Sequence, residues 1–151
     1  GGVLQLDGLP AGKALRQHYL RDELDGGDAD GSIIMVLATD APLSDRNLTR
    51  LARRALAGLA RTGAAMSDGS GDYALAFSTA ADVRRTPERR AGRASYAELP
   101  NQAMSPLFLA AIEAAEEAIY NALAQATSMT GFRGHTAEAL PLHDLAAKLK
   151  T

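Results

Sequence analysis

The stretch DADGSIIMVLATD, residues 28–40, joins an acidic, glycine-bearing loop to a run of apolar residues. The run from Ile33 to Thr39 is bounded by turn-forming residues and rich in Ile and Val, which predicts a strand buried on both faces. Ser32 stands where the loop enters this strand. If the Gly31–Ser32 peptide bond were cut, Ser32 would carry both a hydroxyl and a free α-amine at the mouth of the core.

An N-terminal serine contains the parts of a minimal catalyst. A serine hydroxyl is a weak nucleophile and needs a base beside it. An α-amine titrates near ~8, far below the ~10.4 of lysine, so much of it can accept a proton near neutral pH. From these residues alone the pattern also fits a strand that merely begins after Gly-Ser, and both interpretations stay open at this point.

The composition is that of one globular domain without a strong charge bias. The chain has 151 residues, of which 46% are hydrophobic, and a formal net charge of −2. This charge gives no electrostatic reason to expect nucleic acid or an anionic membrane as a partner. No apolar run approaches the ~18 residues of a membrane span. The chain has no cysteine, which excludes disulfides, thiol catalysis and zinc–thiolate sites.

The first residues, Gly-Gly-Val-Leu, include no initiator methionine and no signal or transit pattern. We therefore expect a fragment, or one chain of a processed protein, with any targeting signal upstream. The sequence leaves the compartment open, and a soluble protein of either the cytoplasm or the periplasm fits it.

Hydrophobic periodicity predicts helices between the strands. Ser44 is expected to cap a helix that has apolar residues at 3.6-residue spacing and that ends at Gly63. Ser105-Pro106 is expected to open a long helix. Its predicted buried stripe consists of Phe108, Ile112, Ala115, Ile119 and Leu123.

Weaker patterns complete the assignment. A second strand is expected at 73–79, and short helices at 14–24 and 142–149. Residues 82–99 are expected to form a charged, irregular and solvated loop. Helices long enough to cover a sheet alternate with strands, so the predicted class is α/β or α+β with layers.

A second informative stretch is MSDGSGD, residues 66–72, where hydroxyl and carboxylate side chains alternate with glycines just before the second strand. Glycine permits close backbone approach, so Ser70 and Asp72 could lie beside the end of the first strand. There Ser70 could orient the Ser32 amine, and Asp72 could stabilise the ammonium. An ordinary Ser/Gly/Asp turn also fits. A phosphate-binding loop does not, because no Gly-Lys-Ser/Thr follows.

The histidines give no catalytic triad or metal site. His18 lies in the weak early helix, and His135 and His143 are eight residues apart across Pro141, a spacing not typical of metal ligands. We expect each to be a surface or capping residue. No cofactor and no metal are expected.

Two long stretches are similar to one enzyme family. They are DGSIIMVLATDAPLSDRNLTRLARRALAGLARTGAAMSDGSGDYALAFSTA, residues 30–80, and TGFRGHTAEALPLHDL, residues 130–145. The first resembles the start of the β subunit of the DmpA-like aminopeptidases, and the second resembles that family's end. This family comprises the L-aminopeptidase/D-Ala-esterase/amidase and β-aminopeptidase enzymes.

The resemblance implies a precursor that cuts itself before a serine. Residues 1–31 would then be the tail of an α chain with its processing loop, and residues 32–151 the catalytic β chain. Gly31–Ser32 matches the cleaved bond and Ser32 the nucleophile. Ser70 and Asp72 match the serine and the acidic residue that position and polarise the amine. The family uses either Glu or Asp at this last position, and this chain has the shorter of the two at Asp72.

The resemblance also implies a setting for the site. The family fold is a four-layer α/β/β/α sandwich, of which this chain would supply only part. An asparagine that stabilises the oxyanion, and further pocket residues, would lie before Gly1 in the α chain. The implied assembly is an oligomer of αβ units, without nucleic acid or membrane.

The function that follows is an N-terminal serine aminopeptidase or amidase. It would release D-Ala, Gly, L- or β-amino acids from small peptides, amides and esters. One alternative is an acyltransferase like the ornithine acetyltransferases, which resemble this family in fold but use Thr at the cut, where this chain has Ser32. Another is an inactive assembly or binding domain, against which the presence of Ser32, Ser70 and Asp72 argues.

Overall fold

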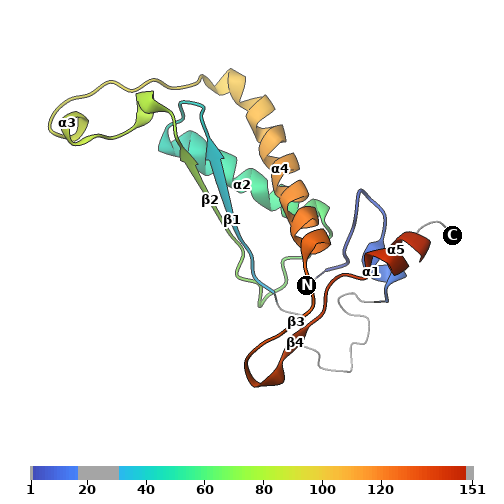
Figure 1. Cartoon of the computed structure of the whole chain (residues 1–151). Helices are drawn as coiled ribbons and strands as arrows, with labels where there is room; N and C mark the ends of the chain where they lie inside the picture. Colours follow the sequence, from blue (N-terminus) through green and yellow to red (C-terminus); the bar gives the residue numbers. More distant parts are fainter. Residues whose placement is uncertain (1, 17–30, 149–151) are drawn as a thin grey trace.

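A computed structural model describes residues 2–16 and 31–148 of the chain (Figure 1). Its centre is a strand–helix–strand unit of β1 (Ile34–Thr39), α2 (Asp45–Arg61) and β2 (Tyr73–Ser78). The two strands are parallel, in a register that runs from Ile34 opposite Tyr73 to Thr39 opposite Ser78. A parallel pair needs a crossover connection, and α2 supplies it. The predicted order of strand, helix and strand is confirmed.

The long helix α4 (Met104–Gln125) packs across α2. The two helices approach closely at Gly58, where an added Cβ would lie 2.5 Å from the Ile112 carbonyl oxygen and 2.8 Å from the Ala115 Cβ. Small residues at a crossing allow such an approach. The close contact makes α2 and α4 one layer over one face of the sheet (Figure 1).

The core lies between this helix layer and the inward face of the strands. One cluster joins Met35 of β1 to Ala55 and Leu59 of α2 and to Ala115 of α4. The neighbouring cluster consists of Leu43, Leu51, Met104 and Ala111. Of the stripe predicted for α4, Ala115 is buried and the other four residues are half-buried. Met104 and Ala111, which the periodicity did not select, are buried instead.

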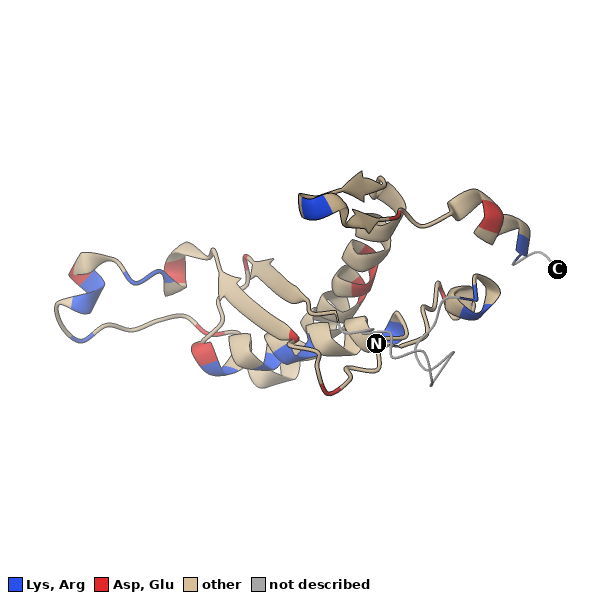
Figure 2. Cartoon of the chain, turned by 90° about the horizontal axis from the view of Figure 1, so that it is seen from below, with Lys and Arg blue, Asp and Glu red and all other residues tan. Residues whose placement is uncertain are grey.

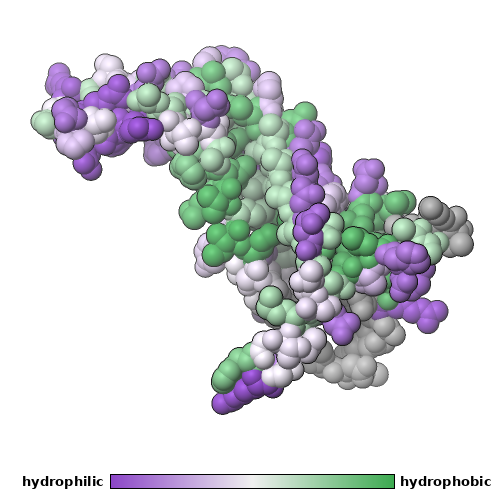
Figure 3. All heavy atoms as spheres, in the orientation of Figure 1, coloured by the Kyte–Doolittle hydropathy of each residue, from purple (hydrophilic) through white to green (hydrophobic). Residues whose placement is uncertain are grey.

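The other face of the sheet is apolar and uncovered within the described residues. Ile34 and Val36 of β1 are 68% and 61% exposed, and Tyr73, Leu75 and Phe77 of β2 are also exposed. Figure 3 shows this hydrophobic surface over the sheet. The prediction of a strand buried on both faces is therefore wrong for this chain, because α2 and α4, the two helices that share core clusters with the sheet, lie on the same side of it. We call these five side chains the bare sheet face.

Residues 80–100 form an arm that extends away from the sheet (Figure 1). It contains two short helical turns, η1 (Ala81–Val83) and α3 (Pro87–Arg90), so the expectation of a fully irregular loop is only partly right. Arg85 and Arg89 lie over the ring of Tyr96, at 5.5 and 5.8 Å from its centroid. Figure 2 shows basic residues along the arm and along α2, with acidic residues among them.

The arm returns to α2 through a polar contact. Glu98 accepts hydrogen bonds from the Ser44 hydroxyl and from the Asn47 side-chain amide, the latter at 3.0 Å. Asn47 is 1% exposed, and its amide oxygen accepts a bond from Arg50 at 2.8 Å. Ser44 is the N-cap residue, as predicted, but its hydroxyl bonds Glu98 and makes no bond to the helix backbone.

The N-terminal segment is tied to the end of α2. The Val3 and Gln5 amides donate to the Gly63 and Thr62 carbonyls at 3.0 and 2.9 Å. The Asp7 amide donates to the Tyr120 hydroxyl at 3.3 Å. A short helix, α1 (Ala11–Ala14), follows. The helix predicted at 14–24 lies mostly outside the described residues, as does His18.

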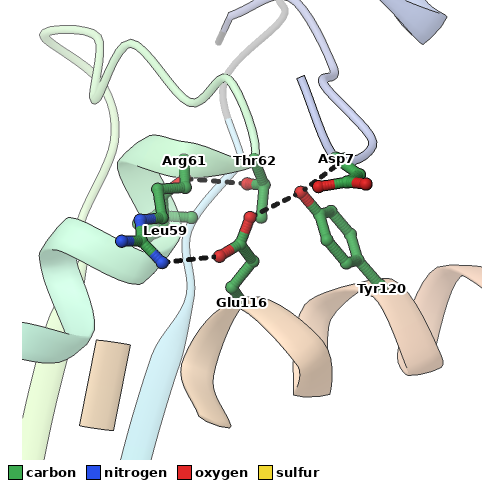
Figure 4. Close-up of polar contacts among 6 residues, drawn as sticks. All are labelled: Asp7, Leu59, Arg61, Thr62, Glu116 and Tyr120. Carbon is green, nitrogen blue, oxygen red and sulfur yellow. Dashed lines mark hydrogen bonds and ion pairs between the residues drawn. The ribbon is translucent and has the colours of Figure 1, made fainter. Parts of the chain in front are cut away.

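A small network anchors Tyr120 in turn (Figure 4). Its hydroxyl donates to Glu116 at 2.8 Å, and the other carboxylate oxygen of Glu116 lies 3.1 Å from Arg61. Burial, and then the bond to Glu116, raise the pKa of Tyr120. The network links three parts of the chain that are far apart in sequence.

The C-terminal part holds a hairpin that the sequence did not predict. It consists of β3 (Met129–Thr130), the turn η3 (Phe132–Gly134) and β4 (Thr136–Ala137). The terminal helix α5 (Leu142–Lys148) was predicted and lies against α1, with Leu145 buried. Leu149, the last residue of the predicted helix, lies outside the described residues.

The start of α4 differs from the one that the sequence predicts. A turn η2 (Asn101–Ala103) leads into α4, which begins at Met104 with Ala103 as its N-cap. The predicted opening by Ser105-Pro106 is therefore wrong by two positions, because burial of Met104 extends the helix backward.

In the described ranges, none of the helices has the length and apolar character needed to cross a membrane.

Candidate active site

The predicted site residues come together because the two strands are parallel. Ser32 lies two residues before the start of β1, and Asp72 immediately precedes β2. Parallel strands start at the same edge of a sheet, so the segments before them lie side by side. The Tyr73 amide bonds the Ile33 carbonyl at 2.9 Å and continues the pairing toward this edge. The site therefore forms at the amino ends of the strands.

Ser32 is exposed, and its hydroxyl oxygen accepts a hydrogen bond from the Gly71 amide at 3.0 Å. This bond fixes the oxygen beside the loop that precedes β2. Because the bond uses a lone pair of the oxygen, the hydroxyl proton stays available for transfer to a base. An added Cβ at Gly71 would lie 3.4 Å from this oxygen, which is ordinary contact.

Ser70 lies between the candidate cleavage site at Gly31 and the carboxylate of Asp72. Its hydroxyl lies 2.6 Å from the Gly31 carbonyl oxygen, and 3.0 and 2.9 Å from the two carboxylate oxygens of Asp72. A hydroxyl has one proton to donate, so these three acceptors compete for it. The Gly31 oxygen is the nearest. A donor at this position polarises the carbonyl of the bond before Ser32.

Asp72 is half-buried and reaches back to the start of β1. One of its carboxylate oxygens accepts a bond from the Ile33 amide at 3.3 Å. The backbone nitrogen of Ile33 is only one residue away from the backbone nitrogen of Ser32. A carboxylate here is therefore placed near any charge that develops on that nitrogen.

These groups surround a small open pocket of about 170 Å³. Gly31, Ser32, Ser70 and Asp72 form its polar side. Its apolar side consists of Ile33, Leu59, Ala64 and Met66. The pocket thus contains each of the residues that the sequence selected for the site. Their individual roles stay a prediction.

A larger groove of about 610 Å³ lies at the other end of the strands, between α2 and the arm. It is lined largely by apolar side chains such as Leu43, Phe77 and Tyr96. It does not include the nucleophile. Size alone does not make it the better candidate, because the smaller pocket holds the convergent polar groups.

The remaining histidines do not join the site. His135 and His143 are exposed, and His143 lies 3.7 Å from the carboxylate of its neighbour Asp144. Among the residues that the structure covers, no cluster of three His, Asp or Glu side chains could hold a metal ion.

The sequence did not predict two of the groups beside Ser32, the Gly71 amide and the Met66 side chain. The Gly71 amide is a backbone donor, and a backbone donor leaves no signal in the side-chain pattern. Met66 lies in the stretch that the sequence singled out, but nothing in its spacing indicated that it lines the pocket. Both come from the same turn, and only the folded loop places them.

Comparison with known proteins identifies the family. Residues 1–137 match the model of peptidase family S58. The β-peptidyl aminopeptidase BapA of Sphingosinicella microcystinivorans is 42% identical over 158 aligned positions, covering 97% of this chain and 39% of the relative. The chain thus spans about two fifths of the length of that relative.

Solved structures agree with this match. The L-aminopeptidase D-Ala-esterase/amidase of Ochrobactrum anthropi, described as a prototype for the serine aminopeptidases and a variant of the Ntn hydrolase fold, superimposes with a TM-score of 0.80 and is 34% identical. The PH0078 protein of Pyrococcus horikoshii superimposes with a TM-score of 0.78 and is 42% identical. Each comparison covers 99% of this chain and 39% of the other.

The mixed helix and sheet arrangement is therefore part of an Ntn hydrolase-like α/β fold. The chain belongs to peptidase family S58.

Proposed function

We propose that the chain is part of a self-processing N-terminal serine aminopeptidase. The observation that carries the proposal is the contact of the Ser70 hydroxyl, at 2.6 Å, with the carbonyl of the residue before Ser32. That carbonyl is the group that a Ser32 nucleophile would attack. The names of the relatives, β-peptidyl aminopeptidase and L-aminopeptidase D-Ala-esterase/amidase, support the same reaction class.

The first step of the proposal is cleavage of the chain by its own serine. The Ser32 oxygen attacks the Gly31 carbonyl carbon through a five-membered ring. The bond from that carbon to the Ser32 nitrogen breaks, the nitrogen takes up the hydroxyl proton, and an ester remains. Water hydrolyses the ester to the Gly31 carboxylate and restores the Ser32 hydroxyl. Ser70 donates a hydrogen bond to the oxygen on which negative charge develops.

The second step is turnover on substrate. The freed Ser32 amine acts as base for its own hydroxyl, which attacks the first carbonyl of a substrate with a free amino terminus. An acyl-enzyme forms, the amine or alcohol leaves with a proton from the Ser32 ammonium, and water completes the hydrolysis. Asp72 stabilises the ammonium through its position beside Ile33. Removal of Gly31 frees Ser70 to bond the new amine.

The bare sheet face supports the proposal that a second chain of the same precursor binds this one. Five large exposed apolar side chains on one sheet face form a larger patch than soluble monomers usually leave in water. The relatives have additional length that could supply a second sheet. We assign the α chain of the same precursor to this face, and place oxyanion and pocket residues on it. An oligomer of αβ units would follow from the family resemblance.

An acetyltransferase of related fold is less well supported, because position 32 is Ser and the named relatives are aminopeptidases. The alternative of an inactive binding domain predicts a chain that stays whole.

The test is made on the full-length precursor. Intact-mass measurement should find two chains that meet between Gly31 and Ser32. Aminoacyl p-nitroanilides of Gly, D-Ala, L-Ala and β-alanine should reveal hydrolysis. Ser32→Ala should leave one uncut, inactive chain, whereas Ser95→Ala, a matched change on the exposed arm, should leave processing and activity unchanged. A Ser32→Ala variant that is cut normally would end the proposal.

A further inference from the structure

The pocket beside Ser32 has an apolar side that the proposed chemistry does not use. It consists of Ile33, Leu59, Ala64 and Met66. Leu59 is a member of the buried core, and Ile33 and Ala64 pack against the same core cluster. Met66 is different, because it belongs to neither core cluster and is 42% exposed. It is a large apolar side chain beside the nucleophile without a packing role in the described core.

The backbone at Met66 is also unusual. Its φ is +49°, in the left-handed region that residues other than glycine, asparagine and aspartate rarely adopt. Such conformations persist where the surrounding structure imposes them, and they cluster at functional sites. The loop is fixed at one end by the pairing of Ala64 with Gly2 and at the other by β2. The fold thus holds Met66 in a costly conformation at the pocket wall.

Gly31 indicates which part of a substrate would meet this wall. In the uncut chain, Gly31 is the residue whose carbonyl faces Ser70 and would pass to Ser32. A substrate's N-terminal residue must present its carbonyl to the same oxygen, so Gly31 marks its approximate position. A Cβ built on Gly31 meets no described atom within 4 Å. An acyl residue with a side chain therefore has room there.

We propose that Met66 is a specificity-determining residue, which contacts the side chain of the released N-terminal residue and favours apolar side chains longer than a methyl group. The inference rests on the proposed aminopeptidase function. A methyl group stays within the open space and does not reach Met66. A leucine side chain is longer and, in this proposal, contacts the apolar wall of the pocket that Gly31 also lines. The flexible thioether of methionine can adapt to several such side chains.

The experiment compares p-nitroanilides of alanine and leucine, as α-amino acids or as β-homologues, whichever series the processed wild-type enzyme hydrolyses. Met66→Ala removes the apolar contact. Met66→Gln keeps the length of the side chain and removes its apolar character. Met129→Ala is the matched control, because Met129 is an exposed methionine on the β3–β4 hairpin and does not line the pocket. Intact mass verifies cleavage of each variant.

Both Met66 variants should lower the ratio of kcat/KM for leucine to that for alanine by about tenfold, the usual effect of losing apolar contact in a pocket. The alanine substrate and the control should change by less than about twofold. If Met66→Ala is not cleaved, Met66→Gln alone decides. An unchanged ratio in an active, processed variant would overturn the inference and leave the aminopeptidase function standing. A wild-type enzyme that hydrolyses Gly or D-Ala p-nitroanilide but neither of these substrates would overturn the inference alone. One that hydrolyses none of the p-nitroanilides would overturn both.

Discussion

Ser70 has one hydroxyl proton and three acceptors within 3.0 Å, so its partner determines what it does. Before cleavage the nearest acceptor is the Gly31 carbonyl, and the hydroxyl polarises it. On the proposed cleavage, that carbonyl would become part of a departing chain end, and the hydroxyl could turn to the Ser32 amine. One side chain would thus serve two successive reactions, while Asp72 holds it in place from the other side.

The first prediction concerns Ser70 and Asp72. Ser70→Ala and Asp72→Asn should lower turnover about 10²–10⁴-fold, the range that assistance to proton transfer contributes. Neither residue belongs to a core cluster, so the free energy of unfolding should change by less than about 1 kcal/mol.

Initial rates and thermal melts of processed enzyme measure the two effects separately. Near-wild-type rates in both variants would remove these residues from the site. Equal losses of rate and stability would indicate a structural role instead.

At this scale the sequence predicted which polar side chains line the candidate pocket. These are hydroxyl and carboxylate side chains next to glycines, just before the two strands, and the parallel pairing brings them together: Ser32, Ser70 and Asp72. It could not predict the Gly71 donor or the place of Met66. Those depend on backbone conformation within the 64–72 turn, which side-chain type does not specify.

At the scale of elements, the end of α2 binds the N-terminal segment through backbone hydrogen bonds. Gly63 has φ +90°, and an added Cβ would lie 1.8 Å from the Val3 carbonyl oxygen. The residue therefore meets two demands, a left-handed helix end and close contact with the N-terminal segment. The position of Gly63 just after the apolar pattern predicted the left-handed helix end. The close contact with Val3 could be found only in the folded structure.

We predict that Gly63→Ala lowers the free energy of unfolding by about 2 kcal/mol or more, since left-handed strain alone costs ~1–2 kcal/mol and the clash adds to it. Gly92→Ala is the control. Gly92 lies on the exposed arm without positive φ, and no described atom is within 4 Å of an added Cβ. Urea unfolding should place this control within about 0.5 kcal/mol of wild type. Equal effects of the two changes would contradict the role given to Gly63.

A second element-scale prediction follows from Tyr120. Burial, and then the bond to Glu116, raise the pKa of Tyr120 above its ordinary 10.0. Its folded form therefore resists loss of the proton more than its unfolded form does. This contribution to stability is complete below pH 10 and is lost as pH rises through the higher pKa of the folded state.

Tyr120→Phe should abolish this part of the alkaline fall in stability. At pH 8 the variant should be less stable by about 1 kcal/mol, because it loses the hydrogen bonds to Glu116 and Asp7. The difference from wild type should shrink above pH 10. Urea titrations at a series of pH values measure this, and a difference that grows with pH would contradict it.

Other elements show why local patterns succeed or fail. α2 follows from hydrophobic periodicity, and β1 and β2 follow from apolar runs, because each element is long enough to show its pattern. The strands of the β3–β4 hairpin have two residues each, too few for any period to appear. The start of α4 depends on a tertiary contact, the complete burial of Met104, which no local signal contains.

At the scale of the whole molecule, the bare sheet face is the main feature that the sequence did not give correctly. A run of apolar residues indicates burial on two sides, but it does not say which part of the protein covers each side. The described residues cover only one face, and in the proposed precursor the α chain would cover the other.

We predict that Leu75→Ser in the full-length protein lowers the free energy of unfolding by about 2–5 kcal/mol, the cost of truncating a buried leucine. This holds because the α chain is expected to cover the face. Leu75 is 59% exposed in this chain, and Leu109 on α4, outside that face, is 50% exposed. Leu109→Ser is therefore the control and should cost less than about 1 kcal/mol. Similar small losses in both variants would mean that the face stays open.

The pairing of residues 3–5 with residues 62–63 has a thermodynamic consequence once the Gly31–Ser32 bond is cut. While the chain is continuous, the connection holds the N-terminal segment near its partner at an effective concentration in the millimolar range for a short flexible link. Cleavage removes that connection, and the same hydrogen bonds become an equilibrium between separate molecules. The melting temperature of the precursor would then be independent of dilution, whereas that of the processed protein would fall on dilution, to the extent that its chains separate on unfolding.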